Sequence, residues 1–176
     1  MKKNLIILFL LIIFPIKAFA LIEVDITRGN LNPLPLAVSP LSIDDKSKTS
    51  FEKILKKENI GSEISIIVEN NLRTSGLFNP LSKDAFLQAP DIANLKPRFE
   101  DWNLIKAQAL ITGKVTYVNE KLRVEFRLWD ILAAKEMMAL AFTTVPSNWR
   151  RVGHIISDKV YERLTGEKGY FDTRII

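Results

Sequence analysis

The stretch from Ala109 to Thr144 constrains the fold more than any other part of the sequence. It holds three successive strand-like segments, at 109–118, 121–130 and 136–144, and Asn119-Glu120 predicts a tight turn between the first two. The middle segment alternates strictly: its apolar members are Leu122, Val124, Phe126 and Leu128, and its polar members are Lys121, Arg123, Glu125 and Arg127. Such a strand packs one face on a core and exposes the other to water.

Two segments have the apolar period of helices that could cover this sheet. The first lies between a candidate N-cap, Asn59, and a candidate stop, Gly76. Its apolar face consists of Ile60, Ile64, Ile67, Val68 and Leu72. The second follows Pro146-Ser147-Asn148 and ends at Gly166. Its apolar stripe consists of Trp149, Val152, Ile156, Val160 and Leu164.

Shorter elements complete the expected order. Strands are predicted at 21–27, 36–38 and 77–81, and a further helix at 99–106. Residues 44–50 are charged, polar and without period, so a loop is expected there. The order β-β-α-β-α-β-β-β-α-β predicts an α/β (α+β-like) fold, with helices packed on one mixed, largely antiparallel sheet in a single domain.

The N-terminus has the pattern of a secretory signal peptide. Lys2 and Lys3 precede an apolar run at 5–14, Pro15 interrupts it, and Ala18-Phe19-Ala20 has the small-x-small form of a cleavage site. Residues 1–20 are therefore expected to be removed, which implies a periplasmic mature protein without stable membrane insertion. An uncleaved anchor is the alternative, although the run is only about half of the roughly 20 apolar residues that a spanning helix needs.

Charge and composition exclude several classes of function. Removing Lys2, Lys3 and Lys17 with the signal peptide leaves 22 basic against 20 acidic residues, too even a balance to predict nucleic-acid binding. The sequence has no cysteine, which excludes disulfides, thiol nucleophiles and a lipid attached through cysteine. No cofactor is expected.

The residues that could take part in catalysis are better explained as solvent-exposed side chains without a catalytic role. His154, the only histidine, lies about 140° from Trp149 at 100° per residue, which predicts a solvated side chain rather than a general base paired with Asp158. The pair Asp44-Asp45 lacks the spacing of a calcium loop and is interpreted as solvated loop charge. With one histidine and no cysteine, a zinc site is also not expected. The sequence predicts no enzyme.

Several stretches, taken in order, resemble the N-terminal domain of the TolB family, periplasmic proteins of the Tol-Pal system. They are VDITRGN (24–30), PLAVSPL (35–41), NLRTSGLFNPL (71–81), AQALITGKV (107–115) and WRRVGHIISDKVYERLTGEKGYFDTRI (149–175). The resemblance extends over nearly all of 21–176 and is weakest at 82–100. It implies an N-terminal arm at 21–30, an α/β domain at 31–168, and at 169–176 the start of a connection to a β-propeller that the chain lacks. A strand is expected to open at Arg174-Ile175-Ile176.

The resemblance also implies partners. The function expected from it is to link inner-membrane TolA and outer-membrane Pal, which supports outer-membrane invagination during division and outer-membrane integrity. Pal would bind mainly through the missing propeller. The alternative function is a stand-alone periplasmic domain that binds a small ligand.

The arm is expected to carry the TolA-binding residues. By resemblance, the C-terminal domain of TolA engages Leu21, Ile22, Glu23, Val24, Asp25, Ile26, Thr27 and Arg28. Apolar and polar residues alternate in this segment, so it could add a strand to a partner's sheet edge. Alternation would equally suit an edge strand of its own domain, and the sequence leaves both possibilities open.

Overall fold

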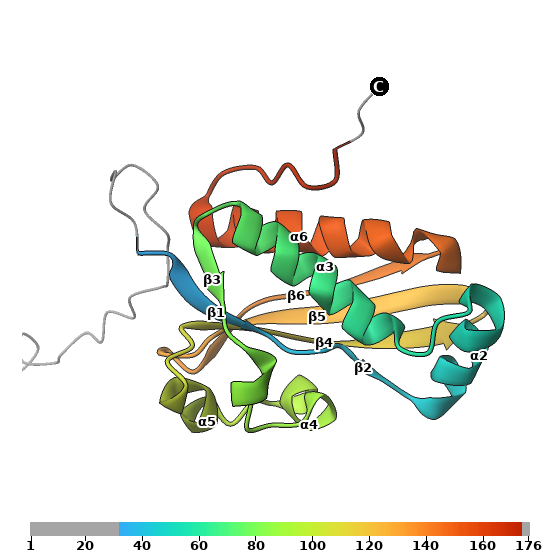
Figure 1. Cartoon of the computed structure of the whole chain (residues 1–176), viewed down its shortest axis with the longest axis horizontal. Helices are drawn as coiled ribbons and strands as arrows, with labels where there is room; N and C mark the ends of the chain where they lie inside the picture. Colours follow the sequence, from blue (N-terminus) through green and yellow to red (C-terminus); the bar gives the residue numbers. More distant parts are fainter. Residues whose placement is uncertain (1–31, 174–176) are drawn as a thin grey trace, which may run out of the picture.

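A mixed sheet forms the centre of the molecule in the computed structural model, which describes residues 32–173 (Figure 1). Its strands follow the order β3-β1-β4-β5-β6, and the short β2 pairs with β4. The bounds are β1 Leu34–Val38, β2 Ser42–Ile43, β3 Phe78–Pro80, β4 Ala109–Val118, β5 Lys121–Asp130 and β6 Lys135–Thr144. Strand β1 runs parallel to β3 and β4, whereas β4, β5 and β6 are antiparallel. The predicted α/β fold with a mixed sheet is confirmed.

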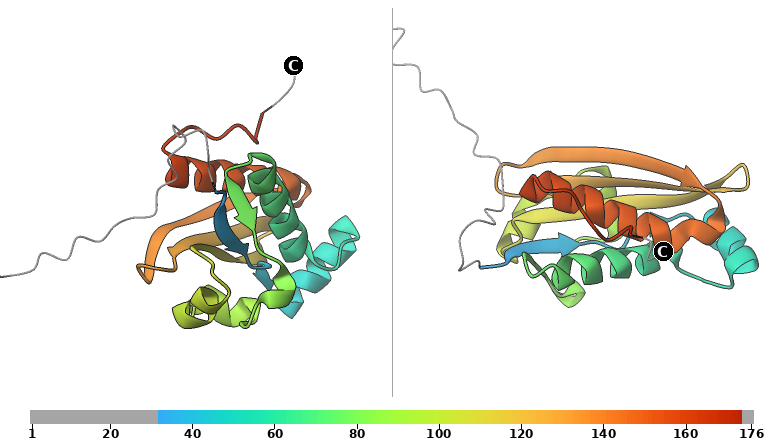
Figure 2. Two further views of the ribbon diagram at one scale, coloured as in Figure 1. Left: turned by 60° about the vertical axis from the view of Figure 1, so that its left-hand side comes forward. Right: turned by 90° about the horizontal axis from the view of Figure 1, so that it is seen from above.

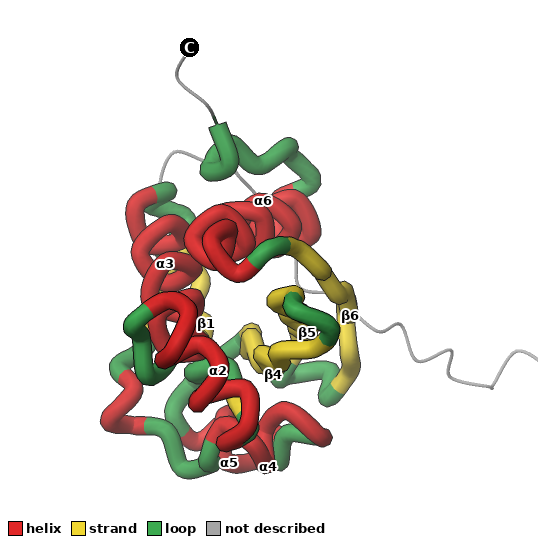
Figure 3. Tube along the Cα trace, turned by 90° about the vertical axis from the view of Figure 1, so that its right-hand side faces the viewer, coloured by secondary structure: helices red, strands yellow, loops and turns green. Residues whose placement is uncertain are grey.

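Helices cover both faces of this sheet (Figures 1 and 3). The two long ones, α3 and α6, lie side by side on one face, and the short α4 and α5 lie on the other. Helix α2 packs at the end of the sheet where β4 turns into β5 (Figure 2). The bounds are α2 Asp45–Leu55, α3 Ile60–Thr74, α4 Pro90–Leu95, α5 Phe99–Leu104 and α6 Trp149–Thr165.

The main core lies between the sheet and the pair α3 and α6. Both predicted apolar stripes contribute to it, together with the four apolar side chains of β5, which are at most 1% exposed. The two helices approach closely at Gly153, where an added Cβ would lie 2.8 Å from Cγ2 of Ile67. A smaller core on the opposite face surrounds Trp102, whose Nε1 donates a hydrogen bond of 2.6 Å to Oε1 of the buried Gln88.

The predicted turn between β4 and β5 is confirmed by its backbone angles. Asn119 and Glu120 have φ of 50° and 61°, as a two-residue type I′ turn requires. The strands then pair in continuous register from Val118 with Lys121 to Ala109 with Asp130. This turn therefore fixes which residues of β5 face the core.

The local structure differs from expectation in several places. Residues 44–50, expected as a loop, are the cap and first turns of α2, with Asp44 as N-cap. The sequence shows no helical period here because the side chains of α2 are mostly polar and only Ser47 and Phe51 are buried. Helix α4 was also missed, since six residues are too few to establish a period. The strand expected at 36–38 begins earlier, at Leu34, and the one expected at 21–27 lies outside the described residues.

Candidate functional site

The residues predicted to bind a partner, Leu21–Arg28, lie outside the described part of the chain. The structure describes the chain from residue 32 onward. The first element is β1, which lies between β3 and β4 and buries Leu36, Ala37 and Val38 almost completely. The N–H of Leu34 donates to the carbonyl of Leu77 at 2.9 Å. The chain that follows the predicted arm is thus held inside the sheet from Leu34 onward.

At the other end, residues 167–173, here called the C-terminal strap, fold back over the outer side of α6 (Figures 1 and 3). The carboxylate of Asp158 accepts hydrogen bonds from the N–H of Phe171, at 2.7 Å, and of Asp172, at 3.1 Å. Arg151 donates to both carboxylate oxygens of Asp172 at 3.0–3.1 Å. Residues 169–173 therefore form a bent segment bound to a helix, and the strand expected to open at Arg174-Ile175-Ile176 lies outside the described residues.

Aromatic contacts complete the attachment of the strap. Tyr161 of α6 is 9% exposed and packs edge-on against Phe78, Tyr170 and Phe171. Burial raises the pKa of its hydroxyl above the usual range, which keeps the side chain neutral. The signal in the sequence for this attachment is the aromatic pair Tyr170-Phe171, which follows the helix stop at Gly166 after three residues.

His154 does not lie on a wet face, contrary to expectation. It is half-buried between α6 and α3, with Nδ1 2.9 Å from Nδ2 of Asn71, and the same amide donates to Oγ of Ser157 at 3.0 Å. The phase of the helix was right but the width of its buried face was not. Because α3, the sheet and the strap all contact α6, burial extends as far round as Tyr161 and Thr165, which flank His154 in phase.

Asp44 is also more than loop charge. Its Oδ1 accepts a bond from the N–H of Ser47 and its Oδ2 accepts one from the Ser47 hydroxyl, at 2.9 and 3.0 Å. The bond from the Ser47 N–H is the main reason that the pKa of Asp44 is lowered. The same Ser47 hydroxyl accepts a bond of 2.8 Å from the N–H of Tyr117, which joins α2 to β4. Asp44 therefore has a structural role, and Asp45 begins the helix.

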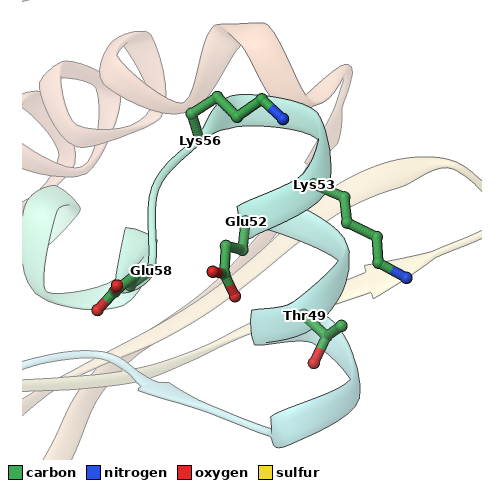
Figure 4. Close-up of a pocket in the computed structure, with 5 residues that line it drawn as sticks. All are labelled: Thr49, Glu52, Lys53, Lys56 and Glu58. Carbon is green, nitrogen blue, oxygen red and sulfur yellow. The ribbon is translucent and has the colours of Figure 1, made fainter.

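Two surface pockets lie among the described residues. One, of about 420 Å³, is lined by Thr49, Glu52, Lys53, Lys56 and Glu58. These side chains fan out along α2 and the loop after it instead of converging (Figure 4). The other, of about 340 Å³, is lined by Ser42, Ile43, Asp44, Asp91, Ile92, Asn94 and Lys114. Small-molecule sites are mostly apolar with a few convergent polar groups. The first pocket does not match that description, because its lining consists of four charged residues and a threonine.

Within the described range, 32–173, histidine and carboxylate side chains nowhere gather in threes that could hold a metal ion. None of its helices combines the length and the apolar character needed to cross a bilayer.

The arrangement of sheet, helices and strap defines the class of the protein as a small α/β domain with helices on both faces of a mixed sheet. Comparison with known proteins makes the class specific, because the sequence profile of the TolB amino-terminal domain matches residues 22–137. The chain belongs to this family. It is 87% identical, over 167 residues and 95% of its length, to the "Tol-Pal system protein TolB" of Pelagibacter ubique (strain HTCC1062).

A solved structure agrees with the fold. TolB from Acinetobacter baumannii superposes on 86% of the chain with a TM-score of 0.64 and 22% sequence identity. The chain spans 37% of the length of the Pelagibacter relative and 33% of the Acinetobacter chain. These matches establish the family and the fold of the chain, and the relatives are about three times as long as the part they share with it.

Proposed function

We propose that this chain is a periplasmic component of a Tol-Pal system and that it acts by binding other proteins rather than by catalysis. The observation that carries this proposal is the 87% identity to a protein named for that system, over 95% of the chain. The signal-peptide pattern at 1–20 supports a periplasmic location. N-terminal sequencing of the secreted chain is expected to begin at Leu21, and recovery of intact Met1 in the membrane fraction would contradict the location.

The proposed partner of the arm is the C-terminal domain of TolA. Eight residues, Leu21–Arg28, extended at about 3.3 Å each, reach roughly 26 Å, enough to add a strand to an exposed sheet edge. Ile22, Val24 and Ile26 would set the register, while Glu23 and Asp25 keep the other side soluble. Removing residues 21–28 would leave every described element intact, because the first of them, β1, begins at Leu34.

Pal is the second proposed partner. By the family resemblance, most of the Pal-binding surface is expected on a propeller that follows the amino-terminal domain. Through both partners the protein would support outer-membrane invagination during division and outer-membrane integrity.

The test compares the chain beginning at Leu21 with the chain beginning at Gly29. Both are expected to melt within a few degrees of one another, and only the longer one should bind the TolA C-terminal domain in calorimetry. The triple substitution of Ile22, Val24 and Ile26 by serine keeps the length and should also abolish binding. Equal binding by the shorter chain would refute the arm as the binding element. Unfolding of the shorter chain would show that 21–28 is a strand of the domain itself.

A further inference from the structure

The sheet ends, on the side away from β3, at β6. In the described residues β6 pairs only with β5, and it is the outermost strand in the end-on view (Figure 3). Long edge strands are usually protected by charges, prolines or bulges. Here such protection lies at one end, where Lys135 and Glu136 are followed by a bulge at Met137. The remaining stretch, 138–144, has the sequence MALAFTT and contains neither charge nor proline.

The register shows which backbone groups of this stretch are open. The two-residue turn makes Val118 and Lys121 a hydrogen-bonded pair, and such pairs alternate along antiparallel strands. The N–H and C=O groups of β5 that point to β6 are therefore those of its even-numbered residues. These residues pair with Met138, Leu140, Phe142 and Thr144. Ala139, Ala141 and Thr143 consequently direct their N–H and C=O groups away from the sheet, toward the open edge.

The side chains beside this edge are apolar on one side of the sheet and small on the other. Met138, Leu140 and Phe142 continue the buried row of β5 on the side that faces α6, and Leu140 is 37% exposed. The small residues Ala139 and Ala141 lie on the opposite side. An added strand would thus find an apolar row on one side and room on the other.

Cationic side chains of α6 mark one end of the edge. Nε of Arg163 lies 3.4 Å from the carbonyl of Met137, at the bulge, and Arg163 forms no ion pair with any described residue. Lys159 lies one turn earlier on the same side of α6 and is 46% exposed, with Glu162 as its partner. Arg163 is thus the cation at this end that has no ion-pair partner among the described residues, and it is complementary to a carboxylate group.

We propose that the β6 edge, defined as residues 138–144 with Arg163 and Lys159 beside it, binds an extended segment of a partner protein as an added antiparallel strand. The segment would alternate apolar and small polar residues, and would have carboxylate groups at the C-terminal end, which comes to lie beside Arg163. Backbone hydrogen bonds to Ala139, Ala141 and Thr143 provide the affinity, and the cations fix the direction. This surface is separate from the proposed TolA-binding arm and does not depend on it.

The experiment titrates the chain beginning at Leu21 with the synthetic peptide acetyl-TITVTVEE-amide and follows backbone amide shifts by NMR. Shifts are expected at residues 138–144 and Arg163. A peptide ending in KK should bind at least about tenfold more weakly, because it reverses the charges. A peptide with alternate N-methylated amides, which cannot form the ladder, should not bind. Equal binding by either control peptide, or shifts confined to other surfaces, would overturn the proposal.

Variants of the protein separate the contribution of charge from that of folding. Lys159→Glu with Arg163→Glu should weaken binding of the acidic peptide about tenfold or more. Lys46→Glu with Lys48→Glu makes the same change of net charge on the exposed side of α2 and should leave binding unchanged. Unaltered melting of both variants is the check on folding. Equal weakening by the two pairs would show a general charge effect and refute the site.

Two other occupants of the edge would each overturn the assignment to a partner. If the chain beginning at Gly29 binds the peptide about tenfold more tightly than the chain beginning at Leu21, the chain's own N-terminal segment occupies the edge. If the shifts of residues 138–144 change with protein concentration in the absence of peptide, a second copy occupies it. Neither effect is expected.

Discussion

On the sheet side of α6, burial is achieved by an apolar stripe that repeats with the period of the helix. On the opposite side, the sequence of α6 is polar, yet that side is covered as well, by a strap whose attachment is mainly polar. The sheet side buries Val152, Ile156 and Val160 to 3% exposure or less. The outer side depends on the carboxylate of Asp158, which accepts two backbone hydrogen bonds.

The difference shows two ways in which a helix face can be covered. An apolar stripe is covered because its removal from water is favourable almost regardless of detailed geometry. A polar face is covered only where specific donors and acceptors meet, because a buried polar group without a partner is costly. The sheet side should therefore dominate global stability, whereas the outer side should contribute less to it and mainly decide whether the strap is attached.

Trp149→Ala is the strongest test of the sheet side. The indole is 4% exposed and belongs to the main core, so its loss should destabilise the domain by about 3–5 kcal/mol. Urea unfolding followed by circular dichroism measures this. Leu132→Ala, at a side chain that is 65% exposed, is the control and should change stability by less than about 0.5 kcal/mol. Equal effects would mean that the stripe does not dominate the stability of the domain.

Gly169→Ala tests the outer side by steric displacement. An added Cβ would lie 2.4 Å from Cα of Asp158, a backbone atom that cannot easily move, so the strap must lift. The expected loss of global stability is about 1–2 kcal/mol, and hydrogen exchange at Phe171 and Asp172 should become fast.

Lys168→Ala, an exposed neighbour in the same strap, is the control for Gly169→Ala and should leave exchange unchanged. If Gly169→Ala destabilised the domain as much as Trp149→Ala does, the proposed division between the two sides of α6 would be wrong.

The same comparison explains what could be predicted from the sequence. Elements with a long apolar period, namely α3, α6 and the three strands from 109 to 144, were predicted because repetition over many residues outweighs local exceptions. Helix α2 was not, because it is held by the Asp44 cap and by Phe51 rather than by a stripe. The parallel pairing of β1 with β3 and β4 is set by tertiary packing and has no sequence signal of its own.

The candidate site was harder to predict for a related reason. The partners of His154 and Asp158 lie 83 and 13–14 residues away in the sequence, at Asn71 and in the strap. The helical period describes one element at a time, so it predicted that the side chains of His154 and Asp158 are exposed to solvent. The predicted arm at 21–28 is outside the described residues and remains a prediction.

His154→Ala examines the border between the two sides of α6. It removes the acceptor at Nδ1 for the Asn71 amide, which keeps only its bond to Ser157, so a loss of about 1 kcal/mol is expected. A double-mutant cycle with Asn71→Ala measures the interaction itself and should give a coupling of about 0.5–1 kcal/mol. A coupling of zero would mean that the His154 side chain is solvated, as the sequence predicted.

Arg151→Ala should have the smallest effect of all. Its guanidinium contacts Asp172 at 3.0–3.1 Å, and this carboxylate raises the pKa of Arg151 further above its usual range. The arginine side chain is 49% exposed, however, and exposed ion pairs are screened by salt and contribute little. The melting temperature is therefore expected to stay within experimental error, and exchange at the Asp172 amide should rise only slightly. In the unsubstituted protein, added salt should produce the same slight rise. If Arg151→Ala instead released the strap as completely as Gly169→Ala, the ion pair rather than the Asp158 carboxylate would hold it. In that case the ion pair would attach the strap to the outer side of α6, and the strap would detach at high salt.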